Sequence, residues 1–139
     1  MADEKNILFV CVENARRSQM AESIFNELAK KNGLKIRAIS AGTMPSNQVD
    51  PNVVRVLKEI GIEVKNQTPK SLTNKTVAKS DKIITMGCLA KKVCPSVFID
   101  KTIDWNIEDP KDKPLEKVRE IRDVIKAKTE ELVRQLSES

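Results

Sequence analysis

The apolar pattern of the first forty residues changes from a strand period to a helix period. Residues 7–12 form an unbroken apolar run, which predicts a strand buried on both faces. From residue 17 to residue 31, apolar residues recur every three or four positions and predict an amphipathic helix. Gly33 stands where a helix end favours a left-handed residue, and residues 34–41 predict a second strand that stops at Gly42. The apolar face of the helix consists of Met20, Ala21, Ile24, Phe25 and Leu28.

A second helix is predicted to begin after residue 50. Asp50 is a favourable N-cap, Pro51 suits the first turn, and Gly61 is expected to end the helix. Residues 62–64 are expected to add a short extended piece. The buried face of this helix is expected to contain Val53, Val54, Leu57 and Ile60.

The second half of the chain continues this alternation of strands and helices. Either Ser71 or Thr73 is expected to cap a short helix that runs through Ala78. Residues 82–86 predict a third strand, and residues 97–99 predict a fourth.

The C-terminal part predicts a loop followed by one long helix. Residues 105–114 are rich in Asp, Lys and Pro, and an amphipathic helix is expected from Pro114 onward. Strands that alternate with helices imply an α/β fold, in which a parallel sheet has helices on both faces. The apolar positions of the last helix are Val118, Ile121, Ile125, Leu132 and Leu136.

Length and composition fit one domain that spans residues 1–139. Hydrophobic residues make up 40% of the chain and charged residues 32%, which is an ordinary balance for a packed domain. The apolar runs are too short to cross a membrane, and the polar N-terminus lacks the pattern of a signal peptide. The expected compartment is therefore the cytoplasm.

The charge of the chain indicates an affinity for anions rather than for nucleic acid. The net charge is +5, but Lys and Arg are interspersed with Asp and Glu. The chain has no Tyr, three Phe and one Trp, too few for a surface that stacks bases. We expect a monomer with a mildly basic surface, no nucleic-acid or membrane partner and no cofactor.

Two residue counts restrict the possible chemistry. The absence of histidine excludes a Cys-His or Ser-His pair, so any acid–base step must use Asp, Glu, Lys or Cys. Three cysteines without a secretion signal favour catalysis or redox exchange over a disulfide framework. No metal site is expected, because so few thiols without histidine make a poor zinc site.

The segment that joins the first strand to the first helix carries the strongest chemical pattern. We call residues 11–18 the anion loop, since its backbone N–H groups are expected to point inward at the start of a helix. Cys11 is expected to exist there largely as the thiolate, and the Ser18 hydroxyl can hydrogen-bond its sulfur. Arg17 can hold two oxygens of a phosphate-like dianion, and Asn14 suits a left-handed backbone position. The expected anion-binding residues are Val12, Glu13, Asn14, Ala15, Arg16, Arg17 and Ser18, of which Glu13 and Arg16 have charges that the pattern does not explain.

Two more chemically active residues are expected at the same edge of the sheet as Cys11. Active sites of parallel sheets form beyond the carboxyl ends of the strands, where Cys88 and Asp109 also follow predicted strands. Attack by sulfur on a tetrahedral oxyanion expels an oxygen that needs a proton. Without histidine, Asp109 is the candidate general acid.

These motifs resemble the low-molecular-weight protein tyrosine phosphatases and their relatives, the thioredoxin-coupled arsenate reductases. The matching blocks are residues 9–22, 40–43 and 105–110. The resemblance implies a flavodoxin-like fold with a four-stranded parallel sheet in the order 2-1-3-4. It also implies roles for four residues: nucleophile for Cys11, oxyanion binder for Arg17, thiolate stabiliser for Ser18 and general acid for Asp109.

The reductase branch of this family is favoured by two further cysteines. Past the third strand the arsenate reductases carry a redox pair, and the resemblance places Cys88 and Cys94 in that role. It implies that Cys11 attacks arsenate, that a Cys11–Cys88 disulfide releases arsenite, and that the disulfide then moves to Cys88–Cys94. Thioredoxin would reduce that last disulfide.

Phosphatases of the family place aromatic residues after the Asp-Pro pair to hold a phosphotyrosine ring. In this chain Pro110 is followed by Lys111 and Asp112, and there is no tyrosine at all. The aromatic side chains that would hold an aromatic leaving group are therefore missing after the Asp-Pro pair.

Two alternatives stay open from the sequence alone. One is a phosphatase that hydrolyses phosphate monoesters through a phosphocysteine on Cys11, with Cys88 and Cys94 protecting that thiol from oxidation. The other is a non-catalytic redox sensor or anion-binding module. The presence of both Arg17 and Asp109 argues against it, since a sensor needs no general acid.

The resemblance also bears on a potassium site. Several reductases bind potassium beside the loop, and the matching ligand positions here are Asn14, Glu22 and Ser40. The remaining acidic ligand is expected near residues 67–70, where this chain has Lys70. An ammonium group cannot bind a cation, so we predict that Lys70 takes the place of the ion and that activity is independent of potassium.

Overall fold

A four-stranded parallel sheet organises the chain in the computed structural model, which describes residues 5–64, 67–87 and 102–138. The strands are β1 (Lys5–Cys11), β2 (Ile36–Gly42), β3 (Lys82–Thr85) and β4 (Thr102–Asp104), in the order β2-β1-β3-β4. This order confirms the one that the resemblance implied. Cys11 pairs with Gly42 at the carboxyl end of the two central strands, so the anion loop leaves the sheet from its middle.

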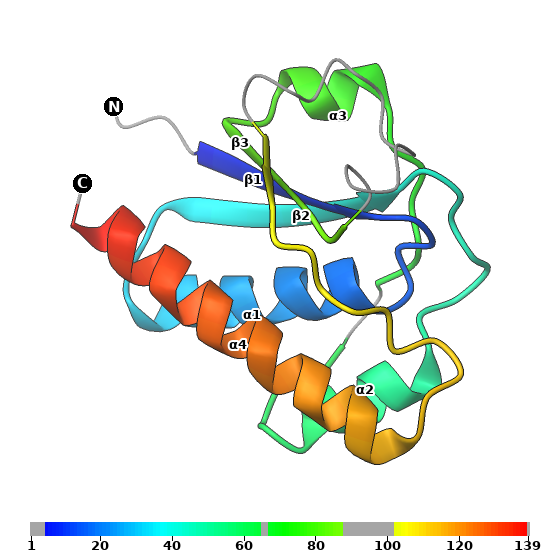
Figure 1. The fold of residues 1–139 in the computed structure, drawn as a ribbon. Helices are drawn as coiled ribbons and strands as arrows, with labels where there is room; N and C mark the ends of the chain where they lie inside the picture. The colour runs from blue at the N-terminus through cyan, green and yellow to red at the C-terminus, as the bar shows by residue number, and fades with distance from the viewer. Residues whose placement is uncertain (1–4, 65–66, 88–101, 139) are drawn as a thin grey trace.

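Helices cover both faces of the sheet, as predicted (Figure 1). The helices α1 (Arg17–Lys31), α2 (Pro51–Lys58) and α4 (Leu115–Ser137) lie on one side, and the short α3 (Asn74–Ala78) lies on the other. The chain therefore forms the three layers of a flavodoxin-like fold.

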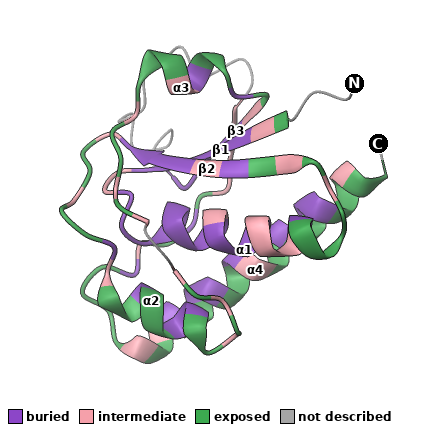
Figure 2. Ribbon diagram, turned by 180° about the vertical axis from the view of Figure 1, so that it is seen from behind, coloured by how far each residue is buried: buried purple, intermediate pink, exposed green. Residues whose placement is uncertain are grey.

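Alternate residues of β1 enter two separate apolar clusters. Phe9 and Cys11 face the larger cluster, which α1, α2 and α4 complete. Leu8 and Val10 face the smaller one, which includes Val77 of α3. Buried residues are concentrated in the central strands and along the side of α1 that faces the sheet (Figure 2). Because β1 is buried on both faces, its end is fixed in position and so is the start of the anion loop.

The predicted helix ends are confirmed where the capping chemistry is explicit. Gly33 has the left-handed φ of 66° that follows α1. Asp50 Oδ1 accepts the Asn52 backbone N–H at 2.9 Å and caps α2. Of the two candidates for the α3 cap, Thr73 is the one observed, since Ser71 forms an isolated bridge with Gly42.

One expectation about the core was wrong, and one about the sheet is outside the described residues. Val54 is 36% exposed and Val56 is buried in its place, because α2 turns the row of Val53, Val56 and Leu57 toward the core. Residues 62–64, expected to be a short extended piece, are not part of the sheet. The strand expected at residues 97–99 lies outside the described residues. The edge strand that pairs with β3 is β4, and its single apolar residue forms no pattern that predicts a strand.

The carboxylate of Glu59 joins the end of α2 to α4. Arg119 donates to both of its oxygens from Nε and Nη2 at 2.8–3.1 Å, and Arg122 Nη1 donates to Oε1 at 2.8 Å. Arg122 also donates to the carbonyl of Val56 at 3.0 Å. The hydrogen bond from Arg119 in particular holds the pKa of Glu59 below its ordinary value of 4.5.

We predict that Glu59→Gln lowers the melting temperature at pH 7 and that this difference disappears in acid. Because the pKa of Glu59 is lowered by folding, its stabilisation is fully present above pH 4.5 and is lost as the pH falls through the lower folded-state value. Thermal unfolding of both proteins between pH 7 and pH 3 measures this. Glu130→Gln, on an exposed position of α4, is the control, and a Glu59→Gln deficit that persists unchanged at pH 3 would contradict the prediction.

Candidate functional site

The carbonyl groups of the anion loop are held from outside, which fixes the direction of its N–H groups. Each carbonyl oxygen of residues 11–15 accepts a hydrogen bond: four from backbone N–H groups of residues 43–50 at 2.8–3.3 Å, and one from Gln19 Nε2 at 3.0 Å. The C=O and N–H of a planar trans peptide point in opposite directions, and the described residues contain no cis peptide bond. The N–H groups of residues 12–16 therefore point into the loop, beside the N-terminus of α1, where they can bind an oxyanion.

Two residues allow the loop to close this tightly. Asn14 has a left-handed φ of 52°, which confirms the sequence prediction. Gly42, at the end of β2, lies against the loop, and a Cβ there would be 2.5 Å from the carbonyl oxygen of Val12. No side chain fits at Gly42 without displacing the loop backbone.

A chain of hydrogen bonds determines which way the Ser18 hydroxyl points. The backbone N–H of Lys70 donates to Asn14 Oδ1 at 2.8 Å, which makes that atom the acceptor and leaves Nδ2 as the donor. Asn14 Nδ2 donates to Ser18 Oγ at 2.7 Å. Ser18 Oγ lies 2.8 Å from Cys11 Sγ, so its single proton is free to be donated to the sulfur. The side chain of Cys11 is buried with those of Ser18 and Asn14.

Arg17 is held at the opening of the loop by backbone carbonyls. Its Nη1 donates to the carbonyl of Met86, which follows β3, and to that of Ile107 at 2.7 Å, in the loop after β4. Its Nη2 lies 3.7 Å from Asp109 Oδ2. The structure thus brings Arg17 and Asp109 together from positions 92 residues apart, as the sequence predicted for a shared site.

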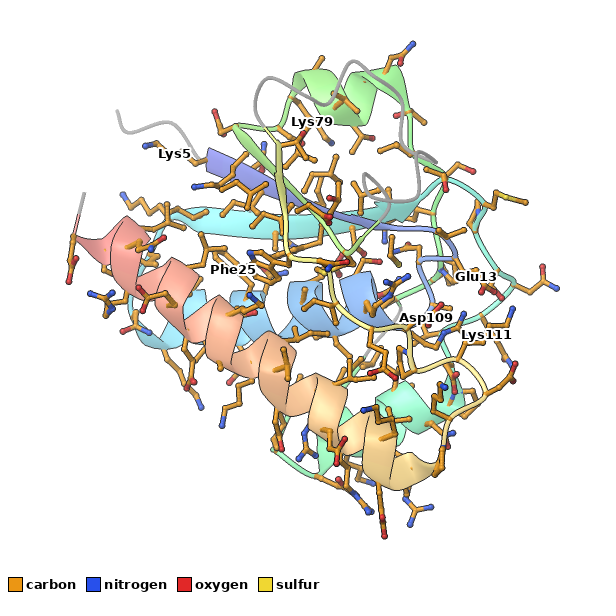
Figure 3. The ribbon with its side chains drawn as sticks, viewed as in Figure 1. Lys5, Glu13, Phe25, Lys79, Asp109 and Lys111 are labelled. Carbon is orange, nitrogen blue, oxygen red and sulfur yellow. The ribbon has the colours of Figure 1, made fainter. Side chains whose placement is uncertain are left out.

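The buried side chain of Arg16 is the centre of an ion-pair cluster. Its Nε lies 3.2 Å from Asp109 Oδ1, its Nη2 2.5 Å from Glu13 Oε2, and its Nη1 3.4 Å from Asp50 Oδ2. Lys111 Nζ lies 3.1 Å from the same Glu13 oxygen. Figure 3 shows Glu13, Asp109 and Lys111 at one end of the sheet. Burial alone would lower the pKa of Arg16, but the charges of Asp109 and Glu13 outweigh it and raise the pKa above its ordinary value.

The oxygens expected at a potassium site are already bonded to protein donors. Glu22 Oε1 accepts from Ser40 Oγ at 2.8 Å and Oε2 from Gln67 Nε2 at 2.7 Å, while Lys70 Nζ lies 3.9 Å from Oε1. Asn14 Oδ1 accepts from Gln19 Nε2 as well as from the Lys70 backbone. The residues present therefore do not fit a bound potassium ion, because N–H groups and an ammonium occupy the same oxygens.

Several residues that build the site had no role in the sequence prediction. Gln19 and Gln67 hold the anion loop and Glu22, and they are hydrogen-bonded to each other at 2.9 Å. Asp104 Oδ1 accepts from the backbone N–H of Gly87 at 2.6 Å and fixes the chain where it leaves β3. Gln19 lies in α1, Gln67 in a loop and Asp104 in β4. The contacts of a single polar side chain depend on tertiary packing, so the sequence prediction gave these residues no role. Cys88 and Cys94 lie outside the described residues.

The comparison with known protein families agrees with this geometry. The family model described as low molecular weight phosphotyrosine protein phosphatase matches residues 6–139. The chain belongs to this family. Within the described residues, no helix is long and apolar enough to cross a membrane, and no group of three His, Cys, Asp or Glu side chains is arranged to hold a metal ion.

Relatives of this phosphatase-family chain include proteins named arsenate reductase. An arsenate reductase of Brevibacillus brevis is 33% identical over 129 residues, covering 92% of this chain and 93% of the relative. A glutaredoxin arsenate reductase of Synechocystis is 32% identical over 136 residues, covering 96% of this chain and 99% of the relative. A solved arsenate reductase in its phosphate-binding state has a TM-score of 0.81 and 30% identity, covering 94% of this chain and 98% of that one. The family and these relatives support an enzyme that acts on an oxyanion.

We predict that this member of the family is indifferent to potassium and that Lys70→Met makes it sensitive. Lys70→Met removes the ammonium that pairs with Glu22, whose side chain is only 12% exposed. The melting temperature of the variant is therefore expected to fall by a few degrees, and potassium is expected to restore part of that loss. Thermal unfolding in matched potassium and sodium chloride measures both proteins, with Lys75→Met of α3 as the control. A greater stabilisation of the wild type by potassium than by sodium would refute the prediction that Lys70 takes the place of the ion.

Proposed function

We propose that the chain reduces arsenate to arsenite by a relay of Cys11, Cys88 and Cys94, and that thioredoxin recycles it in the cytoplasm. The observation that carries the proposal is the hydroxyl of Ser18 directed at Cys11 Sγ at the start of a loop whose N–H groups point inward. This is the environment of a thiolate that attacks an anion. The names of the relatives favour arsenate as that anion.

The first step forms a bond between sulfur and arsenic. The Cys11 thiolate attacks arsenate while the loop N–H groups and Arg17 bind the remaining oxygens. One hydroxyl leaves as water with a proton from Asp109, which ends the step as a carboxylate beside Arg17. Arsenic stays in the pentavalent state at this point.

The second and third steps move two electrons and the disulfide. The Cys88 thiolate attacks Cys11 Sγ, the sulfur–arsenic bond breaks with its electron pair on arsenic, and trivalent arsenite leaves. Cys94 then attacks Cys88, frees the Cys11 thiolate and leaves a Cys88–Cys94 disulfide for the thioredoxin dithiol to reduce. Cys88 and Cys94 enter this scheme through the resemblance of the sequence to the arsenate reductases, since both lie outside the described residues.

The wall of the site near Asp109 suits a small inorganic anion. Lys111, which follows the Asp-Pro pair, extends to Glu13 of the anion loop at 3.1 Å, so charged side chains lie where an aryl group would need an apolar one. Asp112, the next residue, has a left-handed φ of 60° that turns the chain away into the segment before α4. A tetrahedral oxyanion needs no such apolar surface.

A phosphatase acting on phosphate monoesters is the second candidate, and one observation favours it. Met44 is 72% exposed, and its backbone N–H donates to the carbonyl of Val12 at 2.8 Å, so an apolar side chain lies beside the anion loop. An organic leaving group could pack on it. The same Cys11, Arg17 and Asp109 would then form and hydrolyse a phosphocysteine.

The two candidates are separated by a coupled assay with the purified full-length chain. With thioredoxin, thioredoxin reductase and NADPH, we predict steady NADPH oxidation that depends on arsenate. Glutathione with glutaredoxin is the comparison, because one relative is named for glutaredoxin. Absence of arsenate-dependent turnover with either reductant, combined with hydrolysis of an aryl phosphate, would establish the phosphatase instead. A non-catalytic module would show neither activity.

Serine variants of the two remaining cysteines test the relay itself. Cys94→Ser is expected to stop after one turnover, because the Cys11–Cys88 disulfide cannot be passed on. Cys88→Ser is expected to lose arsenate reduction and to keep any aryl phosphatase activity, since Cys11 is the single cysteine that this chemistry needs. Steady turnover by Cys94→Ser would rule out the three-cysteine relay.

A further inference from the structure

Arg16 is held in the anion loop by contacts that the proposed reaction has not used. Its side chain is only 10% exposed, and its three nitrogens point to carboxylates from three separate segments of the chain. Glu13 belongs to the loop, Asp50 caps α2 and Asp109 precedes α4. A buried guanidinium with this set of partners fixes the distance between the loop and Asp109.

The two oxygens of Asp109 have different surroundings. Oδ1 accepts from Arg16 Nε at 3.2 Å and from the backbone N–H of Lys111 at 3.1 Å. Oδ2 has Arg17 Nη2 as its nearest cation at 3.7 Å, which is longer than a hydrogen bond. An oxygen that already accepts two N–H groups is a poor place for a proton, so the acid form of Asp109 carries its proton on Oδ2.

We propose that Arg16 is a positioning residue, which holds Asp109 through Oδ1 so that Oδ2 faces the oxyanion bound by Arg17. This inference rests on the proposed function, because it assigns a role to the general acid of that reaction. When Oδ2 protonates the departing oxygen, its O–H bond breaks and a new one forms on the leaving group. Asp109 becomes a carboxylate that Arg16 continues to hold.

Arg17 cannot orient Asp109 in this way during the reaction. Its Nη1 is bound to the carbonyls of Met86 and Ile107, and the oxyanion competes for its remaining N–H groups. The guanidinium of Arg16 faces Glu13 and Asp50 with its other two nitrogens, so each of its three nitrogens already has a carboxylate partner.

Glu13 and Asp50 share the positive charge of Arg16 with Asp109. Their carboxylate oxygens lie 2.5 and 3.4 Å from its Nη2 and Nη1. Arg16 thus holds Asp109 while its charge is divided among three carboxylates.

A double-mutant cycle tests whether Arg16 acts through Asp109. Wild type, Arg16→Gln, Asp109→Asn and the double variant are compared in hydrolysis of phenyl phosphate, whose leaving group needs a proton, and separately in arsenate reduction. Hydrolysis of phenyl phosphate needs neither thioredoxin nor the other cysteines. A wild type that hydrolyses the ester without reducing arsenate would refute the reductase and still allow the cycle to be measured.

Arg16→Gln is expected to lower kcat by about tenfold with KM nearly unchanged, and Asp109→Asn by about a hundredfold. In the Asp109→Asn background the further change from Arg16→Gln is expected to stay within about twofold. An equal loss of kcat in both backgrounds, or a rise in KM alone, would overturn the proposal.

Two further variants keep the test independent of stability. Arg122→Gln removes another buried arginine that binds a carboxylate and a carbonyl on α2, so it is expected to lower the melting temperature without coupling to Asp109. Arg16→Lys retains the charge in case Arg16→Gln does not fold. Because lysine lacks the planar fork, its kcat is expected to fall between those of wild type and Asp109→Asn, and full activity of Arg16→Lys would also overturn the proposal.

Discussion

The hydrogen bond from Ser18 to the sulfur of Cys11 depends on a backbone group more than fifty residues away. The backbone N–H of Lys70 donates to Asn14 Oδ1 and so fixes the orientation of the Asn14 side-chain amide. That amide donates to Ser18 Oγ, and the hydroxyl proton of Ser18 is left to be donated to Cys11. Every group in this series is buried or part-buried, so none of these bonds is readily exchanged for water. The surroundings of the Cys11 sulfur therefore depend on the fold around the loop as well as on the loop.

The remaining parts of the site converge on this loop from segments that follow different strands. Residues 43–50, after β2, hold the loop carbonyls, and the carbonyls of Met86 and Ile107, after β3 and β4, hold Arg17. The carboxyl ends of parallel strands meet at one edge, which is why residues distant in the sequence can share one anion. In the proposed reaction the two arginines have different roles: Arg17 binds the oxyanion and Arg16 positions the general acid.

The limits of α1, the cap of α2 and the left-handed Asn14 were predictable because each depends on local chemistry or on a periodic pattern. The order of the strands was predicted from the family resemblance instead. The strand β4 was not, since Thr102–Asp104 has one apolar residue and pairs with β3 on one side only. The partners of Arg16 could not be predicted from the sequence either. Glu13 is three residues away, but Asp50 and Asp109 reach it only through tertiary packing.

The most direct test of the proposed chemistry is the number of free thiols left after arsenate is consumed without a reductant. The chain has three cysteines, and reduction of one arsenate takes two electrons. Wild-type protein treated with excess arsenate is predicted to fall from three thiols to one, with Cys11 as the thiol that remains and one arsenite released per chain. Three thiols after the same treatment would contradict the account.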